Sequence, residues 1–157
     1  FKQTPNADER GILISAGVTY LYNNTVDSCD YGIWRSAGTV TAINNLVNGS
    51  ATACYNGTFT SSDYNASSSG TATGGANDRV SQTFTFVDIA NDDYHLASND
   101  AGAKDFGTSD PGTGLFSDDI DGVIRSGTWD IGADEFVSST PPVTTKNIPT
   151  LLLMGLG

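Results

Sequence analysis

The side chains best suited to metal binding or catalysis are four acidic residues in the last third of the sequence. They are Asp119, Asp121, Asp130 and Glu135. Ca²⁺ binds about six to eight oxygen ligands, so Asp119, Asp121 and Asp130 are candidates for a calcium site. An EF-hand loop is excluded, because no third acid and no terminal Glu follow Asp121 at the required spacing.

Arg125 gives the same carboxylates a structural alternative. It lies between Asp121 and Asp130 in the sequence, and a guanidinium forms bidentate ion pairs with carboxylates. Such a pair would close the end of the domain, with Arg125, Asp130 and Glu135 forming a cap. The sequence favours this salt bridge, keeps calcium as the alternative, and indicates no other cofactor.

Catalysis would need other groups. A polysaccharide lyase of the calcium-dependent kind would need an Arg or Lys base beside the ion, and a glycoside hydrolase would need two or three clustered carboxylates. Asp27 and Asp30 are the acids beside Arg35, and we expect all three to be solvated turn residues. His95, the single histidine, is expected to be a hydrogen-bonded structural residue. We therefore assign no catalytic residue.

Aromatic residues leave two interpretations open. Tyr31, Trp34, Tyr55 and Phe59 could form an outer strip that stacks on sugar rings, or they could belong to the core. The residue types alone favour neither.

Composition narrows the possible partners. The chain has 157 residues, with 18 acidic against 7 basic side chains, and a formal net charge of −11. This charge repels nucleic acid and anionic membranes. Abundant Ser, Thr, Asn and Gly are typical of strands and turns. The apolar run Leu151–Met154 is far shorter than the roughly 20 residues that span a bilayer.

An asparagine doublet that returns along the chain predicts the fold. The sequence from Asn23 to Val26 recurs from Asn44 to Val47, a spacing of 21 residues (45 minus 24). Short units repeated at such a period are typical of stacked repeats. We therefore expect Asn24 to stack on Asn45, and Val26 on Val47, in adjacent parallel strands.

The two cysteines extend the repeat. Cys29 and Cys54 each begin a Cys-x-x-Gly element, at a spacing of 25 residues (54 minus 29). With four extra residues inserted between Asn48 and Ala53, Cys29 would lie beneath Cys54. Adjacent strands permit either stacked thiols or a disulfide, and stacked thiols are slightly favoured.

These patterns predict an all-β chain with four parts. Residues 1–65 form β-helix rungs, and residues 66–83 form a Ser- and Gly-rich surface loop. Residues 84–136 form a terminal rung and cap, and residues 137–157 form a Ser/Thr/Pro linker with an apolar tail.

Three ordered motifs resemble the closing segment of a bacterial protein family. They are Phe86-Val87-Asp88 with Asp93-Tyr94-His95-Leu96, then Asp119-Ile120-Asp121-Gly122 with Arg125, then Asp130-Ile131-Gly132-Ala133 through Phe136. The family is that of right-handed parallel β-helix repeat surface proteins of the pectate-lyase-like superfamily. The resemblance implies the last two to three rungs of a right-handed solenoid, with a cap and an extended tail. Ile148-Pro149-Thr150-Leu151 resembles the start of the family's sorting signal.

The expected function is that of a non-catalytic β-solenoid outside the cell or on its surface. Its role would be structural or adhesive, with a polysaccharide or copies of itself as partner. For assembly into a fibre, we expect Leu151, Leu152, Leu153 and Met154 to bury against another chain. The alternative is the C-terminal part of a polysaccharide lyase or glycoside hydrolase with its catalytic rungs upstream.

Overall fold

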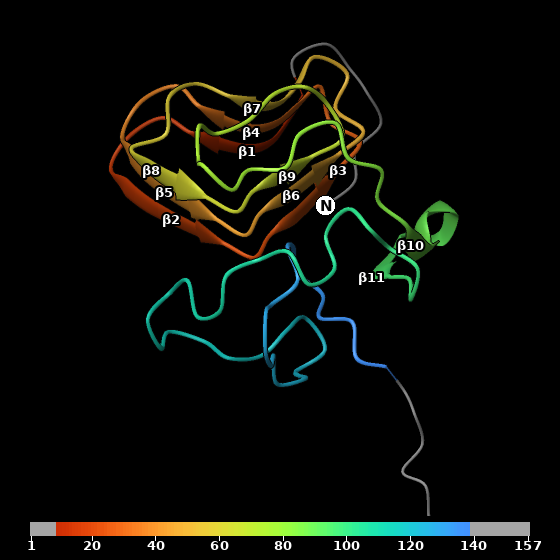
Figure 1. Ribbon diagram of the computed structural model, residues 1–157. Helices are drawn as coiled ribbons and strands as arrows, with labels where there is room; N and C mark the ends of the chain where they lie inside the picture. The colour runs from red at the N-terminus through yellow and green to blue at the C-terminus, as the bar shows by residue number, and fades with distance from the viewer. Residues whose placement is uncertain (1–8, 139–157) are drawn as a thin grey trace, which may run out of the picture.

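The computed structural model describes residues 9–138, and these form an all-β structure (Figure 1). Nine strands make three parallel sheets of three strands each. The sheets are β1 (Arg10–Ile14), β4 (Tyr31–Arg35) and β7 (Ala53–Asn56); β2 (Val18–Tyr22), β5 (Thr39–Ile43) and β8 (Ser61–Asp63); and β3 (Thr25–Asp27), β6 (Leu46–Asn48) and β9 (Ala66–Ser67). An antiparallel hairpin follows, with β10 (Phe86–Asp88), the 3₁₀ turn η1 (Ile89–Asn91) and β11 (Asp93–Leu96).

Each sheet takes one strand from each of three successive turns of the chain. The first turn contributes β1, β2 and β3, the second β4, β5 and β6, and the third β7, β8 and β9. The register pairs Val26 with Val47 and Leu21 with Ala42, as the 21-residue spacing predicts. Parallel strands stacked in this way are consistent with a β-solenoid.

The asparagine doublet forms the corner between the second and third sheets. Asn23 and Asn44 have positive φ angles of 50° and 59°, a conformation that Asn tolerates better than most residues. The second asparagine of each doublet stacks on the next turn of the chain. Asn24 Nδ2 donates to Asn45 Oδ1 at 2.8 Å, and Asn45 Nδ2 donates to Asn65 Oδ1 at 2.9 Å. Asn65, from the third turn, therefore extends the predicted pair to a ladder of three.

Aliphatic side chains fill the inside of the stack. Ile33, Val40 and Val47 are fully buried members of one core cluster. The outward-facing neighbours on the third sheet, Leu46 and Ala66, belong to a second cluster. This alternation follows from the two-residue period of a strand, and it shows that both faces of the third sheet are covered.

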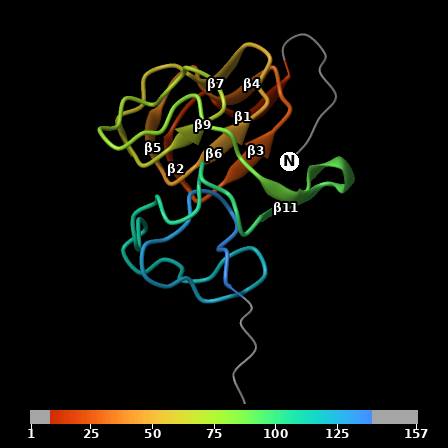
Figure 2. The ribbon, with the colours of Figure 1, turned by 45° about the vertical axis from the view of Figure 1, so that its right-hand side comes forward.

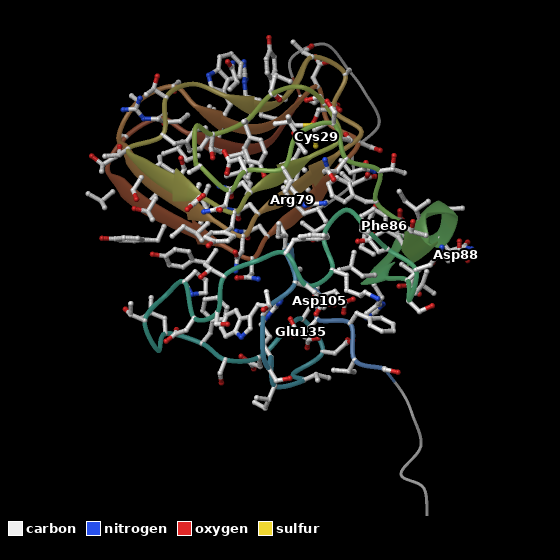
Figure 3. All side chains as sticks on the ribbon, viewed as in Figure 1. Cys29, Arg79, Phe86, Asp88, Asp105 and Glu135 are labelled. Atoms are coloured by element: carbon white, nitrogen blue, oxygen red, sulfur yellow. The ribbon has the colours of Figure 1, made fainter. Side chains whose placement is uncertain are left out.

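The predicted cysteine register is wrong. Tyr31 pairs with Ala53, which places Cys54 beside Gly32 rather than over Cys29. Cys29 instead aligns with Ser50, because the Ala51 amide donates to the Cys29 carbonyl at 2.9 Å. The segment from Asn48 to Ala53 carries one extra residue relative to the segment from Asp27 to Tyr31 (a spacing of 22, 53 minus 31, against 21, 48 minus 27), rather than the predicted four. Both cysteines are buried free thiols, and Figure 3 shows Cys29 among the stacked strands.

Residues 66–83 are more than the predicted surface loop. Ala66 and Ser67 form β9 and are buried. Asp78 then ends the asparagine ladder, because the backbone N–H of Asn65 donates to Asp78 Oδ1 at 3.0 Å. Asp78 Oδ2 holds the segment in place by accepting the amides of Thr73 and Gly75, both at 3.0 Å. The segment therefore covers the last turn of the stack.

The prediction that residues 84–136 form a terminal rung is wrong, because β10 and β11 pair with each other in a separate antiparallel sheet and not with the strands of the stack. Figures 1 and 2 show these residues below the stack, at the corner where the sheet of β2, β5 and β8 meets the sheet of β3, β6 and β9. Leu96 and Ile131 pack there on Leu46 and Ala66. Hydrogen bonds join the two parts, with the Gly132 amide donating to the Asn44 carbonyl at 2.8 Å. The outward-facing Leu46 explains this placement, since burial of its side chain requires a cover.

Two sequence predictions concern residues beyond these limits. Leu151, Leu152, Leu153 and Met154 lie outside the described residues, as do positions 139–157 of the predicted linker and tail. Among residues 9–138, no helix is long and apolar enough to cross a membrane.

Candidate functional site

Arg125 organises the C-terminal segment from a buried position. Its Nη1 forms an ion pair with Glu135 Oε2 at 3.2 Å, and the two side chains are 1% and 6% exposed. Its Nη2 donates to the carbonyls of Gly132 and Ala133 at 3.0 and 2.7 Å. A buried guanidinium needs a partner for each donor, and these contacts supply it. Arg125 is therefore a structural cap, as predicted, but its carboxylate partner is Glu135 rather than Asp121 or Asp130.

Asp130 holds two backbone amides of the C-terminal segment. Its two oxygens accept the amides of Asp105 and Phe136, each at 2.6 Å. Burial is the largest cause that raises the pKa of Asp130 to about 6, and the two amide hydrogen bonds oppose it. Figure 3 labels Asp105 and Glu135 in the C-terminal segment, below the stack.

Asp119 also accepts backbone amides, and its contacts hold the turn from Asp119 to Val123. Its Oδ1 accepts the amides of Asp121 and Val123 at 2.9 and 2.8 Å, and its Oδ2 accepts the Glu135 amide at 3.2 Å. The predicted calcium set is not assembled, because the metal-compatible cluster of the described residues contains Asp121 but neither Asp119 nor Asp130.

That cluster is centred on His95 in β11. His95 Nδ1 lies 2.5 Å from Asp93 Oδ1, and Nε2 lies 2.7 Å from Asp121 Oδ2. These two hydrogen bonds raise the pKa of His95 to about 9, with the Asp93 contact as the larger cause. The same contact lowers the pKa of Asp93. His95 is the hydrogen-bonded residue that the sequence predicts, but its carboxylate partners were not foreseen.

Asp134 completes the cluster from a buried position. It is 6% exposed, and burial raises the pKa of its carboxyl group, against a hydrogen bond from the Leu96 amide to Oδ2 at 2.6 Å. His95 and Asp134 border a cavity of about 280 Å³ that also touches Thr25 and Tyr94. The cluster thus joins the hairpin, the loop at Asp121 and the segment at Asp134.

An aromatic row runs from the second sheet to the C-terminal segment. Tyr20 and Tyr22 lie on the same face of β2, with ring centroids 6.1 Å apart, and Phe116 stacks on Tyr22 at 6.4 Å. Trp129 follows Phe116 at 5.5 Å but is buried. Tyr20 is 62% exposed, so the row opens to solvent at its Tyr20 end. Sequence reasoning missed it because Phe116 is distant from β2 in the chain.

The four aromatic residues considered in the sequence divide into two pairs. Tyr55 and Phe59 are buried in the core. Tyr31 and Trp34 pack together at 4.5 Å outside it, and the Arg10 guanidinium lies 4.3 Å from the Trp34 ring. Only the second pair lies on the outer surface.

Asp27 also departs from the prediction of a solvated residue. It is 1% exposed, Asn48 donates to its Oδ1 at 2.7 Å, and the Tyr94 hydroxyl lies 3.2 Å from Oδ2. Asp27 therefore binds the hairpin to the stack, and its carboxylate is occupied by structural contacts.

Comparison of this chain with protein-family models, with curated proteins and with solved structures found no match. The family that the sequence resembles therefore stays a prediction, and function must be inferred from the residues themselves.

Proposed function

We propose that this chain is an extracellular right-handed parallel β-helix with a structural or adhesive role, which binds a polysaccharide without cleaving it. The stacked parallel strands and their asparagine ladder support the β-helix. The resemblance of the C-terminal motifs to surface β-helix proteins supports the location outside the cell.

The aromatic row formed by Tyr20, Tyr22 and Phe116 is the observation that carries the binding proposal. Aromatic faces supply apolar area for flat ligands, and sugar rings present such faces. Centroid spacings of 6.1 and 6.4 Å allow successive rings to contact one extended chain.

Two hollows beside the row provide room for a ligand. One, of about 280 Å³, is lined by Tyr22, Phe116 and Asp118, and the other, of about 510 Å³, by Phe116, Leu115 and Asp118. The Asp118 side chain is exposed, so its carboxylate is available to accept hydrogen bonds from sugar hydroxyls.

The negative charge of the chain favours neutral polysaccharides over anionic ones. A formal net charge of −11 repels polyanions such as polygalacturonate. We therefore propose a neutral polymer, with a soluble β-glucan as the first probe.

Electrophoresis through native gels that contain β-glucan tests this proposal. We expect the glucan to retard the wild-type chain, and replacement of Tyr20 and Phe116 by Ala to weaken the apparent affinity at least about tenfold, or roughly 1.4 kcal/mol. Leu13→Ala removes an exposed side chain from a different sheet and should bind as the wild type does.

Two results would contradict the proposal. One is equal retardation of the wild type and the aromatic variant. The other is release of reducing or unsaturated ends from the polymer, which would favour the alternative of a lyase or hydrolase.

A further inference from the structure

We propose that His95, Asp121 and Asp134 form a binding site for a first-row divalent transition metal ion, with Zn²⁺ as the representative. One ligand atom from each of the three side chains lies within 4.8 Å of the others. The site differs from the predicted calcium site: the two have Asp121 in common, and their other residues are different.

The hydrogen bond between Asp93 and His95 is the arrangement that a metal-binding histidine requires. Histidine ligands commonly donate the second ring N–H to a carboxylate, which orients the ring and makes the free nitrogen a stronger ligand. Asp93 Oδ1 lies 2.5 Å from Nδ1, so Nε2 is directed toward Asp121, 2.7 Å away.

Asp134 supplies a rigid and poorly solvated ligand. Its side chain is nine-tenths buried, and the Leu96 amide fixes Oδ2 at 2.6 Å. Desolvation makes an uncompensated carboxylate costly. The carboxylates of Asp93, Asp121 and Asp134 outnumber the single imidazole of the cluster, so a dication would offset the excess negative charge.

The ligand types favour zinc over calcium. Imidazole suits Zn²⁺ and neighbouring metals, whereas Ca²⁺ prefers about six to eight oxygens. Zn²⁺ accepts three protein ligands with solvent at a fourth position, and the cavity bordered by His95 and Asp134 leaves space for that solvent.

A bound ion would join three segments that are far apart in the sequence. His95 belongs to β11, Asp121 to the turn held by Asp119, and Asp134 to the segment held by Arg125. Because only the folded chain brings these ligands together, binding would stabilise the C-terminal segment.

Isothermal titration of the full chain with Zn²⁺ tests the site, with Ca²⁺ titrated in parallel. We expect about one Zn²⁺ per chain and at least roughly tenfold weaker binding of Ca²⁺. Binding near pH 7 should release about one proton, because the metal replaces the proton on Nε2, and this is measurable in buffers of different ionisation enthalpy.

Two substitutions and a control locate the ion. Asp121→Asn and His95→Gln should each weaken zinc binding at least about tenfold. Asp105→Asn removes the same charge as Asp121→Asn from another exposed position of the C-terminal segment, and should bind zinc as the wild type does. Circular dichroism of each variant checks that it is folded.

The histidine ring gives a second readout. The chain has one histidine, so its ring signals in the NMR spectrum are unambiguous, and they should shift or broaden when paramagnetic Co²⁺ is added. Unchanged ring signals at saturating metal, or equal zinc affinity in the wild type and the Asp121 variant, would overturn the proposal.

Discussion

At the scale of single residues, Asn45 shows how one side chain can connect three turns of the chain. Its Oδ1 accepts from the Asn24 side chain, and its Nδ2 donates to Asn65 and to the Leu21 carbonyl. Asn45 is fully buried, so a missing partner cannot be replaced by solvent. An unsatisfied buried polar group costs about 1–3 kcal/mol.

Replacement of Asn45 by Ala should therefore lower the free energy of unfolding by about 3 kcal/mol, since several groups lose partners at once. Urea denaturation followed by circular dichroism measures this change. Asn56→Ala, at a less buried position on β7, should stay within roughly 0.5 kcal/mol of the wild type. Similar losses in the two variants would show that the ladder contributes no special stability.

His95 makes stability depend on pH above neutrality. Its pKa is raised from about 6.5 in an unfolded chain to about 9 in the folded one, so folding favours the protonated ring. The stabilisation is complete below about pH 6.5 and is lost as the pH rises through about 9.

Urea midpoints measured between pH 6.5 and 9.5 in the presence of EDTA test this effect. The wild type should lose more stability over this interval than His95→Gln, which lacks the titrating ring. Parallel pH curves for the two proteins would show that the contacts with Asp93 and Asp121 do not raise the pKa.

At the scale of elements, the close approach of adjacent turns explains a glycine in β4. A β-carbon on Gly32 would collide with Val47 Cγ1 and lie 2.6 Å from the Cys54 carbonyl oxygen. Backbone on one side and a core side chain on the other leave no direction for relaxation.

Gly32→Ala should therefore destabilise the chain by at least about 2 kcal/mol. Gly70→Ala is the matched control, because no atom lies within 4 Å of its added β-carbon. The urea midpoints of the two variants should differ clearly, and equal midpoints would mean that the turns can separate without cost.

The elements also show how much the sequence could predict. The doublet at Asn24 and Asn45 predicts the register correctly, because stacked turns place identical side chains in line. The cysteines misled, because the two Cys-x-x-Gly elements do not occupy equivalent positions: Cys29 aligns with Ser50, and Cys54 aligns with Gly32. The cluster at His95 was not predicted, because its members are distant in sequence and follow no period.

At the scale of the whole molecule, the stack and the C-terminal segment share a core. Leu46 and Ala66 from the stack pack with Leu96 and Ile131 from the segment. Parts that share buried apolar area usually unfold together. We therefore expect residues 9–138 to behave as one cooperative unit.

The chain contains two tryptophans, and they report on the two parts separately. Trp34 lies in β4 of the stack, and Trp129 lies in the C-terminal segment. In the variants Trp34→Phe and Trp129→Phe, fluorescence of the remaining tryptophan should follow the same urea transition as circular dichroism. A fluorescence midpoint for Trp129 well below that from circular dichroism would show that the segment undocks first.

The carboxylate of Asp78 makes the two ends of the asparagine ladder chemically different. A carboxamide both receives and passes on a hydrogen bond, whereas an ionised carboxylate only receives one. If a further turn stacked on Asp78, the side-chain oxygen of its asparagine would receive no hydrogen bond, because a carboxylate has no N–H to donate. At the opposite end, β1, β2 and β3 pair on one side only among the described residues. Asp78 thus ends the ladder of side-chain hydrogen bonds at the third turn, so a further turn could continue that ladder only on the side of β1, β2 and β3.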